Sequence, residues 1–173
     1  LPMQGGEARQ ATDLPVNIDD FIWNPNGDGF AFSADVFATA ESLEESAKMD
    51  KEREESPVQA RVIDDLLFRH WNRWTNGMHS HVFVCDLDGE NVIDLTPGAF
   101  DAPPLSLGGQ QDFVFSPDGE QVAFVSNHTD MPAANTNNDV FLVPAAGGSA
   151  ENYTQDNEAV DNQPLYSPDG KFF

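Results

Sequence analysis

The chain alternates apolar and polar residues in short runs that are separated by turn-forming residues. One such stretch, FVFSPDGEQVAFVSN, runs from Phe113 to Asn127. Its two apolar alternations have the period of β-strands. The Ser-Pro-Asp-Gly between them favours a tight turn, because proline fixes φ and glycine supplies a positive φ. The pattern therefore predicts an antiparallel hairpin.

The same hairpin pattern occurs three times along the chain. Residues 21–35 carry it 92 positions earlier, with Asn-Pro-Asn-Gly in the turn. A further copy begins at Tyr166, 51 positions after Phe115, and has a second Ser-Pro-Asp-Gly turn. Internal repetition of this kind is typical of folds in which one small unit stacks on the next.

A second hairpin unit alternates with the first. Residues 81–96 (HVFVCDLDGENVIDLT) match residues 139–154 (DVFLVPAAGGSAENYT) at an offset of 58. Asp-Gly in one copy and Gly-Gly in the other stand where a hairpin turn is expected. The opening PMQGGEARQAT fits the second half of this unit, with Thr12 at the position of Thr154.

Two hairpins in series predict a four-stranded antiparallel sheet, which cannot bury both of its faces alone. The 44 residues from Gln111 to Thr154 match the length of one propeller blade, about 40–45 residues. We therefore predict an all-β protein, a β-propeller fragment of about three four-stranded blades. Residues 1–16 end one blade, 17–97 and 98–155 form two more, and 156–173 begin another.

Asp19 to Thr96 is about 34 residues longer than the 44 residues from Gln111 to Thr154, which predicts an insertion at about 36–75 in the first full blade. Residues 36–56 have helical apolar spacing through Phe37, Ala40, Leu43 and Ala47, and they contain Glu–Lys pairs four residues apart. We therefore expect the insertion to be largely helical.

A second helical segment is predicted directly after the first. Ser56-Pro57 has the pattern of a helix N-terminus, and the apolar residues 62, 63, 66 and 67 follow at helical spacing. The stretch FRHWNRWTNG after them fits either the end of this helix or a strand that leads into Asn76-Gly77.

The charge balance and the composition exclude several classes of protein. Thirty acidic residues against eight basic ones give a net charge of −22, which repels phosphate backbones, so we expect no nucleic-acid partner. No apolar run approaches the length of about 18 residues that spans a membrane. Cys85 is the only cysteine, and its apolar surroundings predict a buried side chain rather than a reactive thiol.

Two patterns suggest metal binding at first sight. Asn24 to Asp35 has the spacing of a calcium loop, but strands flank it, and the repeat predicts a turn there. His79 and His81 alternate on a strand and so face one side, but the sequence places no third ligand, and His70 and His128 show no partner. We predict no metal and no cofactor.

One cluster is a candidate for substrate contact. It comprises Arg69, His70, Trp71, Arg73 and Trp74. Arginine can clamp a carboxylate with two hydrogen bonds, and tryptophan supplies an apolar wall that excludes water.

The alternative interpretation of this cluster is structural. In it, both tryptophans pack the blade against its insertion, and both arginines pair with nearby acids such as Asp64 and Asp65. The acidic stretch from Glu41 to Glu55 is likewise either a solvated helix face or an interaction arm. The residues that follow Asn127 and Asn152 complete the pattern of N-glycosylation acceptors.

The repeat resembles that of known propellers. An aromatic-x-Pro-Asp-Gly hairpin followed by a Gly-Gly hairpin and Leu-Thr or Tyr-Thr is similar to the repeat of TolB-like proteins. The longer strings RHWNRWTNGMHSHVFVCDL and DLTPGAFDAPPLSLGGQQDFVFSPDG resemble the N-terminal propeller of the prolyl oligopeptidase family of serine peptidases, in its dipeptidyl-peptidase 5 and acylaminoacyl-peptidase branch. The resemblance covers essentially all 173 residues.

This resemblance implies a partner domain that performs the chemistry. The family carries a Ser-Asp-His triad on an α/β-hydrolase domain, and its propeller restricts access so that short peptides reach the site. The present chain has no G-x-S-x-G nucleophile motif, since Ser106 and Ser149 lack the flanking glycines. We therefore predict no catalytic residue here, and we expect the hydrolase domain of the same parent protein and short peptides as partners.

A rival hypothesis is a TolB-like propeller that binds other proteins and has no enzymatic activity. Incomplete blades leave strand edges that invite pairing. Either the rest of the parent protein covers them, or copies of the chain form a homo-oligomer, in which two chains could close a six-bladed ring. The usual location of the family that the chain resembles, together with the acidity of the chain, points to a periplasmic or secreted protein. A cytoplasmic location is the alternative.

Overall fold

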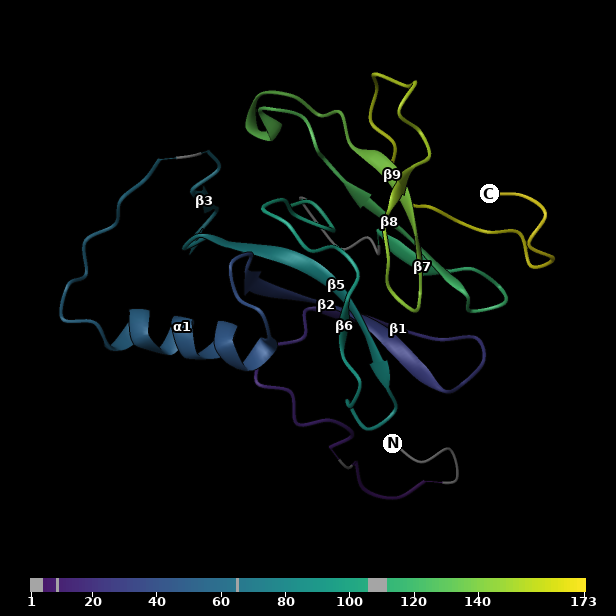
Figure 1. Cartoon of the computed structure of the whole chain (residues 1–173), viewed down its shortest axis with the longest axis horizontal. Coiled ribbons are helices and arrows are strands. Elements are labelled where there is room, and N and C mark those ends of the chain that lie inside the picture. Colours follow the sequence, from purple (N-terminus) through teal and green to yellow (C-terminus); the bar gives the residue numbers. More distant parts are fainter. Residues whose placement is uncertain (1–4, 9, 65, 106–111) are drawn as a thin grey trace.

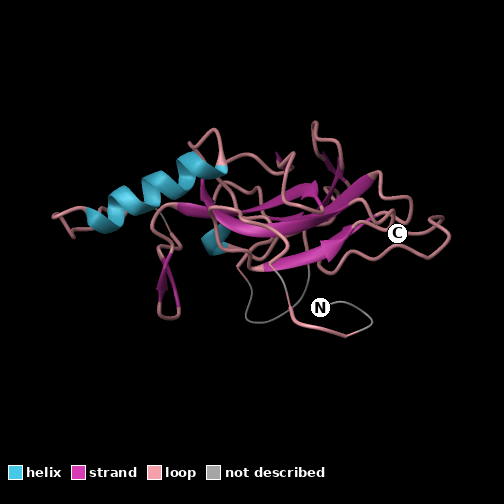
Figure 2. Ribbon diagram, turned by 90° about the horizontal axis from the view of Figure 1, so that it is seen from below, coloured by secondary structure: helices cyan, strands magenta, loops and turns pink. Residues whose placement is uncertain are grey.

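The computed structural model describes residues 5–8, 10–64, 66–105 and 112–173. Within these ranges the chain forms ten strands in three antiparallel sheets, one α-helix and one short 3₁₀ helix. Two four-stranded sheets make up the centre of the molecule, and the helix projects beyond one end of them (Figures 1 and 2). The all-β class agrees with the sequence, while the arrangement of blades in a ring stays a prediction.

The first sheet is a four-stranded meander in which each strand runs antiparallel to its neighbours. Phe32 lies at its centre, opposite Phe21 on one side and opposite Phe83 on the other. In order across the sheet, the strands are β1 (Asp20–Trp23), β2 (Gly29–Phe37), β5 (Met78–Asp86) and β6 (Ile93–Asp94).

The second sheet repeats this order. Phe124 and Phe141 stack at a centroid distance of 5.3 Å, as Phe32 and Phe83 do at 5.2 Å in the first sheet. The strands, in order across the sheet, are β7 (Phe113–Phe115), β8 (Gln121–Ser126), β9 (Asp139–Pro144) and β10 (Glu151–Asn152), and the 3₁₀ helix η1 (Pro132–Ala134) lies between β8 and β9.

All three predicted proline turns form, and they close in the same way. In each, the glycine has a positive φ, and its N–H donates to the carbonyl three residues earlier. The bonds run from Gly27 to Asn24 at 2.9 Å, from Gly119 to Ser116 at 2.8 Å and from Gly170 to Ser167 at 2.9 Å.

A threonine closes the second unit in both sheets. Oγ1 of Thr96 accepts the N–H of Val82 at 2.9 Å, and Oγ1 of Thr154 accepts the N–H of Val140 at 3.0 Å. Each hydroxyl thereby holds the end of the last strand against the strand before it. Residues that are 58 positions apart in the sequence thus make the same hydrogen bond in the two sheets.

The two faces of each sheet differ in side-chain size, because alternate residues point to opposite sides. In both sheets one face, here called the aromatic face, carries the large rings, and the other, here called the small-residue face, carries alanine and valine. The aromatic faces comprise Phe21, Trp23, Phe30, Phe32, Phe83 and Cys85 in the first sheet and Phe113, Phe115, Val122, Phe124, Phe141 and Val143 in the second. The small-residue faces comprise Ile22, Ala31, Val82 and Val84 in the first sheet and Val114, Ala123, Val125, Val140 and Leu142 in the second.

The main core forms where the aromatic face of the second sheet packs on the small-residue face of the first, with Leu95 and Ala102 between them. The stacking then continues in the same direction. Tyr166, which occupies the position of Phe115 in the last copy of the hairpin, packs on the small-residue face of the second sheet. In both of these contacts, large rings meet small side chains.

The insertion contains the predicted first helix, α1 (Leu43–Glu55). Its N-cap is Ser42, whose Oγ accepts the N–H of Glu45 at 3.2 Å. Phe37, which was expected in the helix, belongs to β2 instead, since it pairs with Met78 in the sheet. In the described part of the chain, no helix combines the length and apolar character of a membrane span.

The prediction of a second helix after Ser56 is wrong. Ser56 caps the C-terminus of α1, and the described residues from 57 to 68 form neither helix nor strand. The apolar side chains here find no cover, since Val62 is 85% exposed. A short helix without packing is marginal in water, and β-branched residues weaken it further. The insertion is therefore only partly helical.

The strand alternative for the following stretch is correct. β3 (Arg69–His70) and β4 (Arg73–Trp74) form a small hairpin. It leads into Asn76 and Gly77, whose φ values of 56° and 78° make the turn before β5.

A matched pair of substitutions tests the shared threonine bond. Thr96 is 2% exposed, so Thr96→Val leaves the N–H of Val82 without an acceptor inside the core and should lower the free energy of unfolding by about 1–3 kcal/mol. Thr154 is partly exposed, and water can replace its hydroxyl, so Thr154→Val should cost under about 1 kcal/mol. Urea unfolding measures the free energy of unfolding of both variants, and equal costs would contradict the claim that burial makes the bond of Thr96 the more costly one to lose.

Candidate functional site

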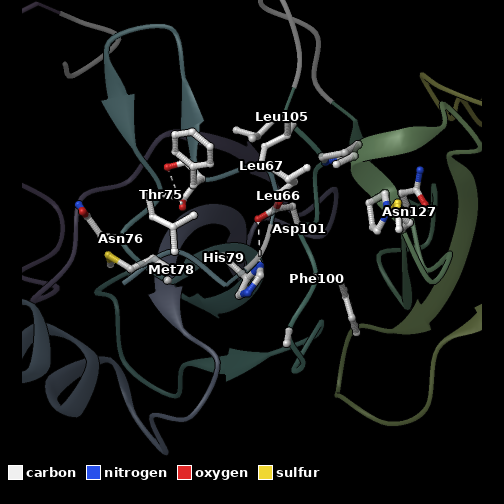
Figure 3. Close-up of a pocket in the computed structure, with 18 of the residues that line it drawn as sticks. Leu66, Leu67, Thr75, Asn76, Met78, His79, Phe100, Asp101, Leu105 and Asn127 are labelled. Carbon is white, nitrogen blue, oxygen red and sulfur yellow. Dashed lines mark hydrogen bonds and ion pairs between the residues drawn. The ribbon is translucent and has the colours of Figure 1, made fainter. Parts of the chain in front are cut away.

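A hollow of about 1610 Å³ opens at the end of the sheets where β5 and β9 begin. The insertion between β2 and β5 forms one side of it. The loop 127–138, between β8 and β9, and the loop 99–105 form the others (Figure 3). In each sheet, the connection between the second and the third strand thus contributes one wall of the hollow.

The wall from the insertion carries a cluster of apolar side chains, alongside charged residues such as Arg61 and Asp64. Figure 3 shows Leu66 and Leu67 grouped with Leu105 of the neighbouring loop. All three side chains are exposed, as are most of the apolar residues around them. The other apolar residues of this wall are Val58, Val62, Ile63, Phe68 and Trp74.

The wall from the loop 127–138 is mostly polar and includes the amide side chains of Asn127, Asn135 and Asn138. Nδ2 of Asn127 donates to Oδ1 of Asn135 at 3.0 Å, and Nδ2 of Asn135 donates to Oγ1 of Thr129 at 2.8 Å. Nδ2 of Asn138 donates to Oδ1 of Asn162 at 3.4 Å. These bonds fix the amide groups in place around one side of the hollow.

Trp74 connects the apolar wall with a positive charge. Its ring stacks with that of Phe68 at a centroid distance of 5.9 Å. The guanidinium carbon of Arg61 lies 4.5 Å from the centre of the Trp74 ring, and that of Arg69 lies 5.9 Å away. Both distances are in the range of cation–π attraction. An arginine held in this way keeps its hydrogen-bond donors available at the hollow.

The five candidate residues lie on one hairpin but do not share one site. Arg69 is opposite Trp74, and His70 is opposite Arg73. Of the five, all of them described, Trp74 is the one that lines the hollow. Trp71 occupies the hairpin turn and is 74% exposed. A substrate-contact role for the cluster stays a prediction.

The arginine pairing differs from the sequence-based alternative. Nη2 of Arg73 lies 3.3 Å from Oδ2 of Asp35 on β2, so this arginine ties the hairpin to the first sheet. Burial, and then the charge of Asp19, raise the pKa of Asp35, and Arg73 opposes them. Asp65, the other acid considered for these pairs, lies outside the described residues.

His81 has a structural role. It is 2% exposed, with Nδ1 2.8 Å from Oδ2 of Asp94 and Nε2 2.8 Å from the carbonyl of Gly98. The Gly98 carbonyl and an ionised Asp94 carboxylate both accept hydrogen bonds, so the charged form of the ring, in which both nitrogens donate, satisfies both partners. Burial lowers the pKa of His81, but the hydrogen bond and charge of Asp94, with the Gly98 carbonyl, outweigh it and raise the pKa.

Metal binding finds no support in the described part of the chain, where no three potential metal ligands come together. His79 lines the hollow with Nδ1 3.4 Å from Oδ1 of Asp101. In the stretch with calcium-loop spacing, Oδ1 of Asn24 accepts the N–H of Asn26 at 2.8 Å, as in a turn. Nδ2 of Asn26 donates to the carbonyl of Asp118 in the equivalent turn of the second sheet at 2.8 Å.

Several polar residues singled out in the sequence serve the fold. Asn127 is buried and bonded to the loop, and Nδ2 of Asn152 donates to Oδ2 of Asp139 at 2.8 Å. The ring centroid of His128 lies 3.8 Å from that of Phe100, and burial lowers the pKa of this histidine while Asp139 opposes the shift. Cys85 is buried as predicted, and burial, with the charge of Asp86, raises the pKa of its thiol to about 11.

Most residues of the hollow are not predicted by the sequence patterns. Arg61 and the apolar residues before the hairpin fall in the predicted second helix, and no pattern groups the asparagines. Four asparagines between residues 127 and 138 were the available signal. Ser149 is exposed after a turn, and Ser106 lies outside the described residues.

Comparison with known proteins identifies relatives named dipeptidyl-peptidase 5. Dipeptidyl-peptidase 5 of Porphyromonas endodontalis is 29% identical over 174 residues, which cover 97% of this chain and 24% of that protein. The proteins of the same name from Porphyromonas gingivalis and Arthroderma otae are 27% and 30% identical over 89% and 96% of the chain. No protein-family model matches the chain. These similarities support a relationship to this group of peptidases.

The chain corresponds to only a small part of each relative. It spans 24%, 22% and 25% of the lengths of these three proteins. The similarity is thus consistent with a domain or segment of a larger peptidase.

The charged state of His81 predicts a dependence of stability on pH. An unfolded histidine titrates at about pH 6.5. The pKa of His81 in the folded protein is raised, so its contribution is complete below about pH 6.5 and is lost as the pH rises through the folded pKa. The free energy of unfolding should therefore fall over this range, and the fall should disappear in His81→Gln.

Urea unfolding across this pH range measures the slope, and NMR titration of the His81 ring in the unchanged protein gives the folded pKa directly. A ring that titrates below about 6.5 would contradict the assignment, whatever the variant does.

Proposed function

We propose that this chain is a non-catalytic segment of a serine peptidase of the dipeptidyl- or acylaminoacyl-peptidase type. In this proposal it gates and orients short peptides for an α/β-hydrolase domain elsewhere in the parent protein. The observation that carries the proposal is the similarity of 97% of the chain to about a quarter of a protein named dipeptidyl-peptidase 5. The remaining three quarters of such a protein have room for the catalytic domain.

We further propose that the two sheets are blades of a β-propeller. Equal strand order, equal turn bonds and packing in one direction support this. A stack of sheets with unlike faces leaves one uncovered face at each end, and closure into a ring removes both. The proposed blade limits are 17–97 and 98–155, with partial blades on either side.

The hollow is the proposed contact with the peptide. An extended peptide has apolar side chains, which fit the wall of Leu66 and Leu67, and backbone amides, which fit the asparagine wall. The Arg61 guanidinium over the Trp74 ring offers donors to a carboxylate. The hairpin cluster of residues 69–74 takes part through Trp74, with Arg69 beside it.

Activity of the full-length protein tests the proposal. We expect it to release dipeptides from chromogenic dipeptidyl substrates and to react with a serine-directed fluorophosphonate probe, since the family resemblance implies a serine nucleophile. Residues 1–173 alone should do neither, because they carry no nucleophile motif. A full-length protein that neither cleaves nor reacts would favour the rival hypothesis, a binding module without activity.

Two tryptophan substitutions in the full-length protein test the contact with the peptide. Trp74→Ala removes a ring that lines the hollow and should raise KM for peptide substrates about 3- to 10-fold, with kcat changed less than about twofold. Trp71→Ala, in the exposed turn of the same hairpin, is the matched control and should leave both constants unchanged. Equal effects of the two changes, or an effect on kcat alone, would contradict the proposed contact between the hollow and the peptide.

A further inference from the structure

We propose that Asn76 is a site of spontaneous deamidation, a modification that turns its neutral amide into a carboxylate. The chain contains two Asn-Gly dipeptides, at residues 26–27 and 76–77. The fold holds the reacting groups of the first dipeptide and leaves those of the second free to meet. This inference concerns the chemistry of one turn and does not depend on the proposed peptidase function.

The reaction needs two groups of one dipeptide to meet. The backbone nitrogen of the glycine loses its proton, attacks the side-chain carbonyl carbon of the asparagine and closes a succinimide ring. The bond between that carbon and the side-chain nitrogen breaks, and the nitrogen leaves as ammonia. Water then opens the ring to aspartate or isoaspartate. Glycine favours ring closure, because it has no Cβ to block the approach and its backbone turns freely.

Both reacting groups of the first dipeptide are held by hydrogen bonds. Nδ2 of Asn26 donates to the carbonyl of Asp118 at 2.8 Å, and the N–H of Gly27 donates to the carbonyl of Asn24 at 2.9 Å. The amide also packs tightly on the equivalent turn of the second sheet, where a Cβ on Gly119 would lie 2.7 Å from Nδ2 of Asn26. Ring closure at this site requires that both bonds break and that the side chain leaves the neighbouring turn.

The reacting groups of the second dipeptide make no such bonds. Within the described residues, neither the side chain of Asn76 nor the N–H of Gly77 has a hydrogen-bond partner. One bond closes the turn, from the N–H of Met78 to the carbonyl of Thr75 at 3.0 Å, and it uses neither reacting group. In the same part of the chain, a Cβ on Gly77 would meet no atom beyond its neighbours within 4 Å, so the approach to its nitrogen is open.

Asn76 lies where the modification changes the charge of two hollows at once. It lines the large hollow, and Figure 3 shows its amide at the edge, apart from His79 and Asp101. It also lines a smaller hollow of about 370 Å³, together with Asp19 and Asp35. Burial, and then the charge of Asp19, already raise the pKa of Asp35. A carboxylate at position 76 therefore adds a negative charge where negative charge is already disfavoured.

Peptide mapping of the full-length protein by mass spectrometry tests the proposal. The protein is incubated at mildly alkaline pH, which promotes loss of the glycine amide proton, and the deamidated fraction at each Asn-Gly dipeptide is followed over time. We expect Asn76 to react about tenfold faster than Asn26, because two hydrogen bonds hold the reacting groups of the Asn26 site. Equal rates at the two sites, or no reaction at Asn76, would overturn the proposal.

The same measurement in urea is the control. Unfolding removes the bonds that hold Asn26, so both dipeptides should then react at similar rates. A difference that persists in urea would overturn the proposal, because it would come from the neighbouring residues in the sequence and not from the fold. Incubation in water enriched in heavy oxygen labels only the groups that react before digestion, so reaction during the mapping is not counted.

Two substitutions test the effect of the new charge without any activity assay. Asn76→Asp should give a lower urea midpoint of the full-length protein than the neutral control Asn76→Ser, because it places a like charge in the hollow that Asp35 lines. Added salt should reduce the difference, since it screens exposed charges from one another. Equal midpoints at low salt would overturn the inferred effect of the charge, while the peptide map decides whether the reaction takes place.

Discussion

The packing of large rings on small side chains is the interaction on which the structure depends. Phe124 and Ala31 are both almost completely buried, and each needs the other, since a four-stranded sheet alone leaves both faces in water. Because the two faces differ, the sheets can stack in one direction only. Equivalent strand ends then come to the same end of the molecule, which is why residues at the starts of β5 and β9 both line the hollow.

A polar pair occupies the same position in both sheets, but the residues that form it differ. Nδ1 of His81 meets Asp94 at 2.8 Å, and in the second sheet Asp139 and Asn152 make the equivalent bond at 2.8 Å. The repeat therefore preserves a bond rather than a residue. A pair at this place satisfies polar groups that the core would otherwise leave unpaired, and its members can vary as long as one donates and one accepts.

The sequence predicts the parts of the fold that local patterns determine. Period-two alternation and the turn glycines Gly27, Gly119 and Gly170 suffice to place the hairpins, because each depends on residues close in the chain. The insertion is different. Val62 and Leu66 have the spacing of a helix, but whether such a helix forms depends on a surface to pack against, which the spacing does not reveal. The contact between Arg61 and Trp74 likewise depends on the path of the loop.

The two ends of the stack of sheets differ in how similar the connections of the two sheets are. At one end, the short turns around Gly27 and Gly119 are nearly identical, and Asn26 bonds directly from one to the other. At the opposite end, the connections between second and third strands have diverged, residues 38–77 into an insertion with an acidic helix and an apolar stretch, and residues 127–138 into an amide-rich loop. The stacking of the sheets does not depend on the sequence of these connections, so the two connections can differ in chemistry. The chemistry that distinguishes the two connections therefore meets at the hollow, which both of them line.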